Sequence, residues 1–196
     1  MIKLIIWDLS GVVGNMEEPL YLEQFAKTHE VHFHELEKVY YSHLYKAERG
    51  EIPLREVWEK TLHHFNIKRH HKDIAHEIMG LKTFDYDVLD YIQDLRSKCK
   101  VAYLTNYAEE YWEIHQKMID LSEYFDFGIV SYQIKARKPD SKGFLAIMHQ
   151  FKVTPQETLF IDDSEKNIAA AKQLGISAIQ FQSLEQLKEE IGKILE

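Results

Sequence analysis

Short apolar runs alternate with amphipathic segments over much of this sequence. Five runs are mostly rich in β-branched or aromatic residues and apolar on both faces: residues 2–7, 100–104, 127–131, 158–161 and 177–181. Such runs are typical of parallel strands that are covered on both sides. Segments with apolar residues at helical spacing separate the later runs, at residues 86–97, 141–151, 164–174 and 183–195. This alternation predicts an α/β fold with a doubly wound (Rossmann-like) parallel sheet.

The stretch from residue 15 to residue 85 interrupts this alternation. It contains no comparable strand-like run, and helical patterns occupy residues 20–27, 34–47, 53–65 and 72–79. The chain therefore begins its sheet with one strand, leaves it for a helical insertion, and returns to complete it. We predict an α/β core formed by residues 1–14 and 86–196, with residues 15–85 inserted as an α-helical cap domain.

Composition limits the classes of partner and the compartment that are expected for this protein. The net charge of −8 argues against nucleic acid or an anionic membrane surface as the main partner. No apolar run reaches the roughly 20 residues that cross a bilayer, and the N-terminal run reads as a buried strand and not as a signal peptide. The single cysteine, Cys99, rules out an intrachain disulfide framework. Together these features predict a cytoplasmic protein in a reducing compartment.

Polar residues follow the predicted strands at the points where they end. Ligands of open α/β sheets bind outside the carboxyl ends of the strands, so these residues are expected to act together. The candidates are Asp8 and Ser10 after the first strand, Thr105 and Asn106 after the second, Lys138 between the third and fourth, and Asp162 and Asp163 after the fourth.

These residue types form a set that can handle phosphate. Three neighbouring carboxylates would repel one another without a cation, and Mg²⁺ prefers oxygen ligands. A lysine and a metal can neutralise phosphoryl oxygens, a hydroxyl can donate to one, and a carboxylate can attack phosphorus. Each residue alone is more often an ordinary turn or helix-cap residue. Their joint occurrence at strand ends predicts a magnesium-dependent phosphatase of a small phosphorylated metabolite.

The four motifs resemble those of the haloacid dehalogenase superfamily, in the branch with a helical cap after the first motif. The resemblance covers essentially the whole chain. Its carriers are Trp-Asp8-Leu-Ser-Gly-Val-Val, Leu-Thr105-Asn, Arg-Lys138-Pro-Asp and Phe-Ile-Asp162-Asp163-Ser. Two segments are similar to the sugar-phosphatase-like group, related to glucose-1-phosphate phosphatases and the N-terminal domains of epoxide hydrolases. They are the Glu-Arg-Gly-Glu-Ile stretch at residues 48–52 and the run from Asp-Asp-Ser through Asn167 to Gly175.

The resemblance implies a role for each residue at the strand ends. Asp8 would be the nucleophile, forming an aspartyl-phosphate, and a metal ligand. Thr105 would bind the phosphoryl group with the backbone of Asn106, and Lys138 would bridge Asp8 and the phosphate. Asp163 would bind Mg²⁺ directly, and Ser10 would bind it through its backbone carbonyl. Asp162 would either bind the metal itself or hold the residues that do.

Ser10 departs from the pattern of the family, whose phosphatases usually carry an acid/base aspartate at this position. A serine hydroxyl donates a proton poorly near neutral pH, and loss of a positioned acid or base costs about 10²–10⁴ in rate. From Ser10 alone, we expect aryl phosphates, which have good leaving groups, to be cleaved far better than alkyl phosphates.

Two other functions remain open at this point. A haloacid dehalogenase releases halide, which needs no protonation, but its chemistry would not need the Asp162–Asp163 pair. A catalytically impaired phosphate-binding protein would also tolerate Ser10, but retention of Asp8, Thr105 and Lys138 with Asp163 argues against it.

The predicted cap is rich in histidine and aromatic residues. Nine of the eleven histidines lie between His29 and His76, without a zinc-site spacing, so we expect a solvated polar face. A cap histidine could still replace the missing acid. Tyr45 and Phe25 are candidates for the floor of the substrate pocket.

Overall fold

The computed structural model describes residues 1–15 and 17–195; Met16, in the predicted cap, and Glu196, at the end of the predicted core, lie outside the described residues. Five parallel strands form one sheet in the order β3-β2-β1-β4-β5. They are β1 (Leu4–Trp7), β2 (Lys100–Thr105), β3 (Phe127–Val130), β4 (Thr158–Asp162) and β5 (Ser177–Gln180). The predicted doubly wound parallel sheet is confirmed, with β1 as its central strand.

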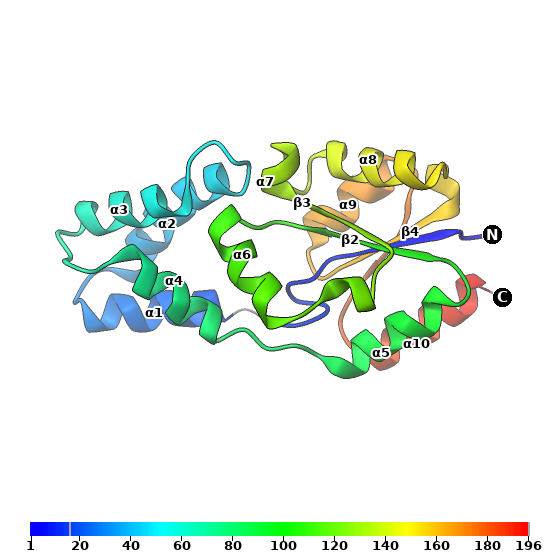
Figure 1. The fold of residues 1–196 in the computed structure, drawn as a ribbon, viewed down its shortest axis with the longest axis horizontal. Helices are drawn as coiled ribbons and strands as arrows, with labels where there is room; N and C mark the ends of the chain where they lie inside the picture. Colours follow the sequence, from blue (N-terminus) through cyan, green and yellow to red (C-terminus); the bar gives the residue numbers. More distant parts are fainter. Residues whose placement is uncertain (16, 196) are drawn as a thin grey trace.

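Helices cover both faces of the sheet, which explains why its strands are apolar on both sides (Figure 1). One face packs against α5 (Tyr86–Arg96) and α10 (Leu184–Leu195), and the other against α8 (Ser141–Phe151) and α9 (Glu165–Gln173). In β1, Ile5 and Trp7 face the α5 and α10 side, while Leu4 and Ile6 face the α8 and α9 side. All four side chains are fully buried.

The segment between β1 and α5 is helical, as its sequence pattern predicts. We call this segment the cap, and it contains α1 (Glu18–Thr28), α2 (Phe33–Ala47), α3 (Leu54–His64) and α4 (His71–Gly80). Buried cap residues such as Leu22, Tyr40 and Trp58 belong to the same apolar cluster as Ile5 and Trp7 of the sheet. The cap and one face of the sheet therefore share a single hydrophobic core.

Two helices were not expected from the sequence. The helix α6 (Glu109–Met118) lies between the sheet and the cap (Figure 1), in contact with α3 and α4. Its Glu110 carboxylate accepts the Leu54 backbone N–H at 3.0 Å through both oxygens, at the start of α3. The short α7 (Ser131–Ile134) begins at Ser131, so the third strand ends one residue earlier than the sequence pattern predicts.

The remaining ordered turns are short. Two 3₁₀ turns, Leu121–Glu123 and Pro155–Glu157, precede β3 and β4.

Across residues 1–15 and 17–195, no helix combines the length and the apolar character that crossing a membrane requires.

Candidate active site

The register of the sheet brings the predicted site residues to one edge. Trp7 pairs with Tyr103 of β2 and with Ile161 of β4, and the backbone N–H of Asp8 donates to the Ile161 carbonyl at 2.8 Å. Asp8 therefore lies beside Asp162, at the carboxyl ends of two adjacent strands. Ligand sites of open α/β sheets are found at this edge, where the strand order changes direction.

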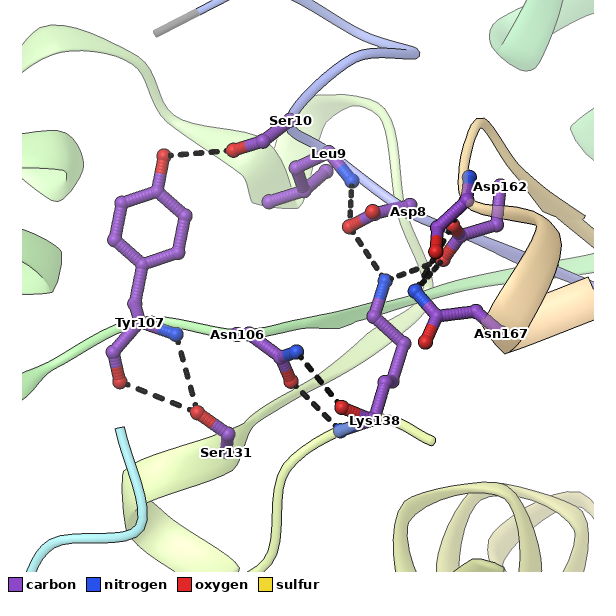
Figure 2. A network of polar contacts seen from close by, with 10 residues as sticks. Asp8, Leu9, Ser10, Asn106, Tyr107, Ser131, Lys138, Asp162 and Asn167 are labelled. Carbon is purple, nitrogen blue, oxygen red and sulfur yellow. Dashed lines mark hydrogen bonds and ion pairs between the residues drawn. The ribbon is translucent and has the colours of Figure 1, made fainter. Parts of the chain in front are cut away.

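Lys138 joins the two buried aspartates. Its Nζ lies 2.7 Å from Asp8 Oδ1 and 2.7 Å from Asp162 Oδ2 (Figure 2). Burial by itself lowers the pKa of Lys138, but the two carboxylates more than offset it, so its pKa is raised. The lysine therefore stays charged at the end of β1.

Asn106 fixes the position of this lysine. Its Oδ1 accepts the Lys138 backbone N–H at 2.8 Å, and its Nδ2 donates to the Lys138 carbonyl at 3.2 Å. The side chain of Asn106 thus has a structural function that the sequence did not indicate, and phosphate binding by its backbone stays a prediction.

Three carboxylates converge beside Lys138. Asp8, Asp162 and Asp163 each offer an oxygen, and these atoms lie within 4.8 Å of one another. Burial raises the pKa values of Asp8 and Asp163, and the negative charge of Asp162 raises both further. When ionised, the three carboxylates and Lys138 carry a net charge of −2, which one divalent cation neutralises.

The donor set fits Mg²⁺ in its chemistry and its packing. It consists of oxygen atoms, which Mg²⁺ prefers over nitrogen and sulfur. Gly11 has φ +84°, and a Cβ at this position would lie 2.4 Å from the Asp163 carboxylate. Only glycine therefore leaves room for the Asp163 side chain beside the Asp8 loop.

Asn167 orients Asp162. Its Nδ2 donates at 3.0 Å to both oxygens of Asp162, and the Ser164 backbone N–H donates to Asp162 Oδ1 at 2.8 Å. The side chain of Ser164 makes no capping hydrogen bond. Asp162 therefore also accepts the backbone N–H of Ser164, the residue that precedes α9, and Asn167 was not among the predicted site residues.

Thr105 has an unused hydroxyl at the end of β2. Its Oγ1 is fully buried and has no hydrogen-bond partner within the described residues. Buried hydroxyl groups are normally hydrogen-bonded, so an unpartnered one at a ligand edge indicates that a ligand supplies the partner. This observation supports the predicted binding of a phosphoryl oxygen by Thr105.

Ser10 has a tyrosine as its neighbour. Its Oγ lies 3.3 Å from the Tyr107 hydroxyl (Figure 2). Burial raises the pKa of Tyr107 well above its ordinary value, and the hydrogen bond with Ser10 acts in the opposite direction. Neither hydroxyl provides the acid that an aspartate at position 10 would provide.

The cap meets the site next to Lys138. Arg137 pairs with the buried Glu48 of the cap at 2.5 Å, and its guanidinium lies 4.1 Å from the centre of the Tyr45 ring. Phe25 instead packs against Trp58 inside the cap. All nine cap histidines are exposed or half-buried, as expected for a solvated face.

A buried carboxylate lies in α1 of the cap. The hydroxyl groups of Tyr40 and Tyr41 donate to the two oxygens of Glu18. Burial raises the pKa of Glu18 to about 7, although both hydrogen bonds act in the opposite direction.

The fold and this set of residues define a class of hydrolase. Residues 5–181 match the family described as haloacid dehalogenase-like hydrolase. The chain belongs to this family.

Similar proteins include sugar-phosphate phosphatases. The phosphorylated carbohydrates phosphatase of Thermotoga maritima is 27% identical over 187 residues, covering 90% of this chain and 83% of the relative. The D-ribitol-5-phosphate phosphatase of Bacteroides thetaiotaomicron is 26% identical over 204 residues, covering 100% of this chain and 99% of the relative.

A solved structure of a related enzyme has a similar fold. A haloacid dehalogenase family enzyme of Bacteroides thetaiotaomicron, crystallised with magnesium and inorganic phosphate, is 26% identical with a TM-score of 0.79. The match covers 95% of this chain and 99% of that one.

Proposed function

We propose that this protein is a magnesium-dependent phosphatase of small, sugar-like phosphorylated metabolites, with Asp8 as its nucleophile. One observation carries the proposal: Asp8 is held by Lys138 within a cluster of three carboxylates, beside the unpartnered hydroxyl of Thr105. Two relatives that span almost the whole chain are named as phosphatases of phosphorylated sugars or sugar alcohols, which supports this substrate class.

The side chains divide the work of phosphoryl transfer. Lys138 holds one oxygen of Asp8, so the nucleophile is oriented before substrate binds. Thr105 donates to a phosphoryl oxygen, and Lys138 places a positive charge where negative charge develops. Water then releases phosphate from Asp8. Mg²⁺ held by Asp8, Asp162 and Asp163, with the Ser10 carbonyl, would neutralise phosphoryl charge.

The test is hydrolysis of 4-nitrophenyl phosphate by the purified protein, with Mg²⁺ and with a chelator. We expect turnover only with Mg²⁺, and its loss in Asp8→Asn, because the amide is not a nucleophile toward phosphorus. Asp73→Asn, at an exposed position on α4, is the matched control and should keep full activity. Turnover that survives in Asp8→Asn would contradict the role of Asp8.

The two alternatives give different outcomes in the same assay. A dehalogenase would release halide from 2-haloacids independently of Mg²⁺. A phosphate-binding protein without catalysis would bind phosphate but show no turnover.

A further inference from the structure

Lys82 is a largely buried cation without a described partner, and its charge interacts with that of the nucleophile Asp8. Within the described residues, Lys82 and Lys138 are the two buried lysines. Lys138 has two carboxylates at 2.7 Å, whereas Lys82 has no ion pair or hydrogen bond to its side chain among those residues. The Lys82 side chain is largely buried, but its Nζ is not among the fully buried polar atoms that lack a partner, which are Trp7 Nε1, Thr105 Oγ1 and His115 Nδ1 among the described residues. A largely buried ammonium with no paired anion favours the binding of an anionic ligand.

The backbone fixes Lys82 against the loop that follows Asp8. Thr83 N–H donates to the Asn15 carbonyl at 2.9 Å, and Asp85 N–H donates to the Val13 carbonyl at 2.8 Å. A Cβ on Gly14 would lie 2.0 Å from the Thr83 carbonyl oxygen, so glycine permits this close pairing. The segment that carries Lys82 is therefore tied to the nucleophile loop.

The ammonium of Lys82 lies over two aromatic rings, and one of them belongs to Tyr107, the neighbour of Ser10. Its Nζ lies 5.4 Å from the centre of the Phe84 ring and 5.7 Å from that of Tyr107, whose hydroxyl contacts Ser10. The titratable groups around it are Asp8, Tyr107 and His115; burial and the charge of Lys82 lower the pKa of His115 to about 3, so His115 is neutral.

We propose that Lys82 donates the proton to the leaving oxygen, in place of the aspartate that Ser10 replaces. This proposal rests on the proposed phosphatase function. It also answers the difficulty that sugar phosphates are alkyl phosphates, whose leaving oxygen needs a proton. Burial lowers the pKa of Lys82 to about 8, opposed by the charge of Asp8, and that range suits a general acid near neutral pH.

The two half-reactions balance with Lys82 as the proton carrier. In the first, an Asp8 oxygen bonds to phosphorus, the bond to the leaving oxygen breaks, and that oxygen takes a proton from the Lys82 ammonium. In the second, water bonds to phosphorus, the bond to Asp8 breaks, and the Lys82 amine takes a proton from the water. Alcohol, phosphate and the original ammonium result.

The test compares an alkyl and an aryl substrate in Lys82→Met. Ribitol 5-phosphate needs a proton on its leaving oxygen, whereas 4-nitrophenyl phosphate needs much less assistance. We expect Lys82→Met to lose about 10²–10⁴ in kcat on ribitol 5-phosphate and less than about tenfold on the aryl ester. The alkaline decline of the wild-type pH profile should disappear in the variant. Lys68→Met, at an exposed position, is the control.

Two further variants separate proton transfer from charge alone. Lys82→Arg keeps the charge but does not release a proton, so it should fail on the alkyl substrate; retained turnover there would overturn the proposal. Adding Ser10→Asp to Lys82→Met should restore alkyl turnover, because an aspartate supplies the acid again.

The outcomes also distinguish this proposal from the proposed function. A wild type that hydrolyses neither ester would overturn both. An active wild type, with equal losses on both esters in folded Lys82→Met, would overturn only the role of Lys82. Thermal unfolding checks folding, and we expect the midpoint of Lys82→Met to be equal or higher because the variant buries no unpaired charge.

Discussion

The Thr105 hydroxyl is an atom that can serve ligand binding without contributing to the stability of the fold. A buried hydroxyl without a partner contributes no hydrogen bond to the folded protein, yet it is placed where a phosphoryl oxygen would be bound. The hydroxyl therefore contributes a favourable hydrogen bond only when ligand is bound.

For Thr105→Val, we predict weaker binding of phosphate without loss of stability. One hydrogen bond to a charged oxygen contributes about 1.5–3 kcal/mol, so the inhibition constant for inorganic phosphate should rise by about ten- to a hundredfold. The free energy of unfolding should stay the same or increase. Thr105→Ser keeps the hydroxyl and is the control; a marked drop in the melting temperature of Thr105→Val would indicate a structural role instead.

The sequence predicted that the candidate residues after the strands would lie together, because strand ends converge in a parallel sheet. Asp8, Thr105 and Asp162 could be placed together by this rule alone. Tyr107 and Lys82 could not, because their positions depend on which segments pack together: Lys82 becomes notable only when it is largely buried without a paired anion. Their neighbours in the sequence carry no signal of this.

At the scale of elements, the strands were predictable and α6 was not. The strands are short and apolar on both faces, a pattern that few other structures share. The helix α6 buries Tyr111, Trp112 and His115 and contains few aliphatic residues, so its apolar stripe is weak in the sequence. Its position depends on contacts with the cap, which the local sequence does not encode.

The burial of Glu18 in α1 makes stability depend on pH. Because its pKa is about 7 when folded and about 4.5 otherwise, the folded state binds more protons between these values. Stability is therefore lost as the pH rises from about 4.5 to 7, by up to about 3 kcal/mol. We predict that the free energy of unfolding of Glu18→Gln falls less between pH 5 and pH 8 than that of the wild type, measured by urea denaturation.

Glu23→Gln provides the control for this comparison, because Glu23 is an exposed residue of the same helix. It should reproduce the wild-type difference between the two pH values. Identical differences in Glu18→Gln and the wild type would mean that Glu18 titrates normally in the folded protein.

At the scale of the whole molecule, the carboxylate cluster couples the metal to folding. Lys138 offsets only part of the negative charge of Asp8, Asp162 and Asp163, so the remaining repulsion opposes the folded state, and a cation that binds only the folded chain stabilises it. We predict that Mg²⁺ at about a hundred times its dissociation constant stabilises the protein by about 2.7 kcal/mol. Calorimetry with Mg²⁺ or chelator measures this, and Asp163→Asn should reduce the shift while Asp73→Asn should not.

The central place of β1 has a consequence for the protein during its synthesis. The strand is synthesised before the cap helices, and both of its neighbours in the sheet, β2 and β4, are synthesised after them. The cap helices are made between them and are stabilised largely by contacts close in sequence, which form quickly. A nascent chain would therefore carry a partly formed helical cap beside an apolar strand with two open edges, a state that favours aggregation or chaperone binding until β4 arrives.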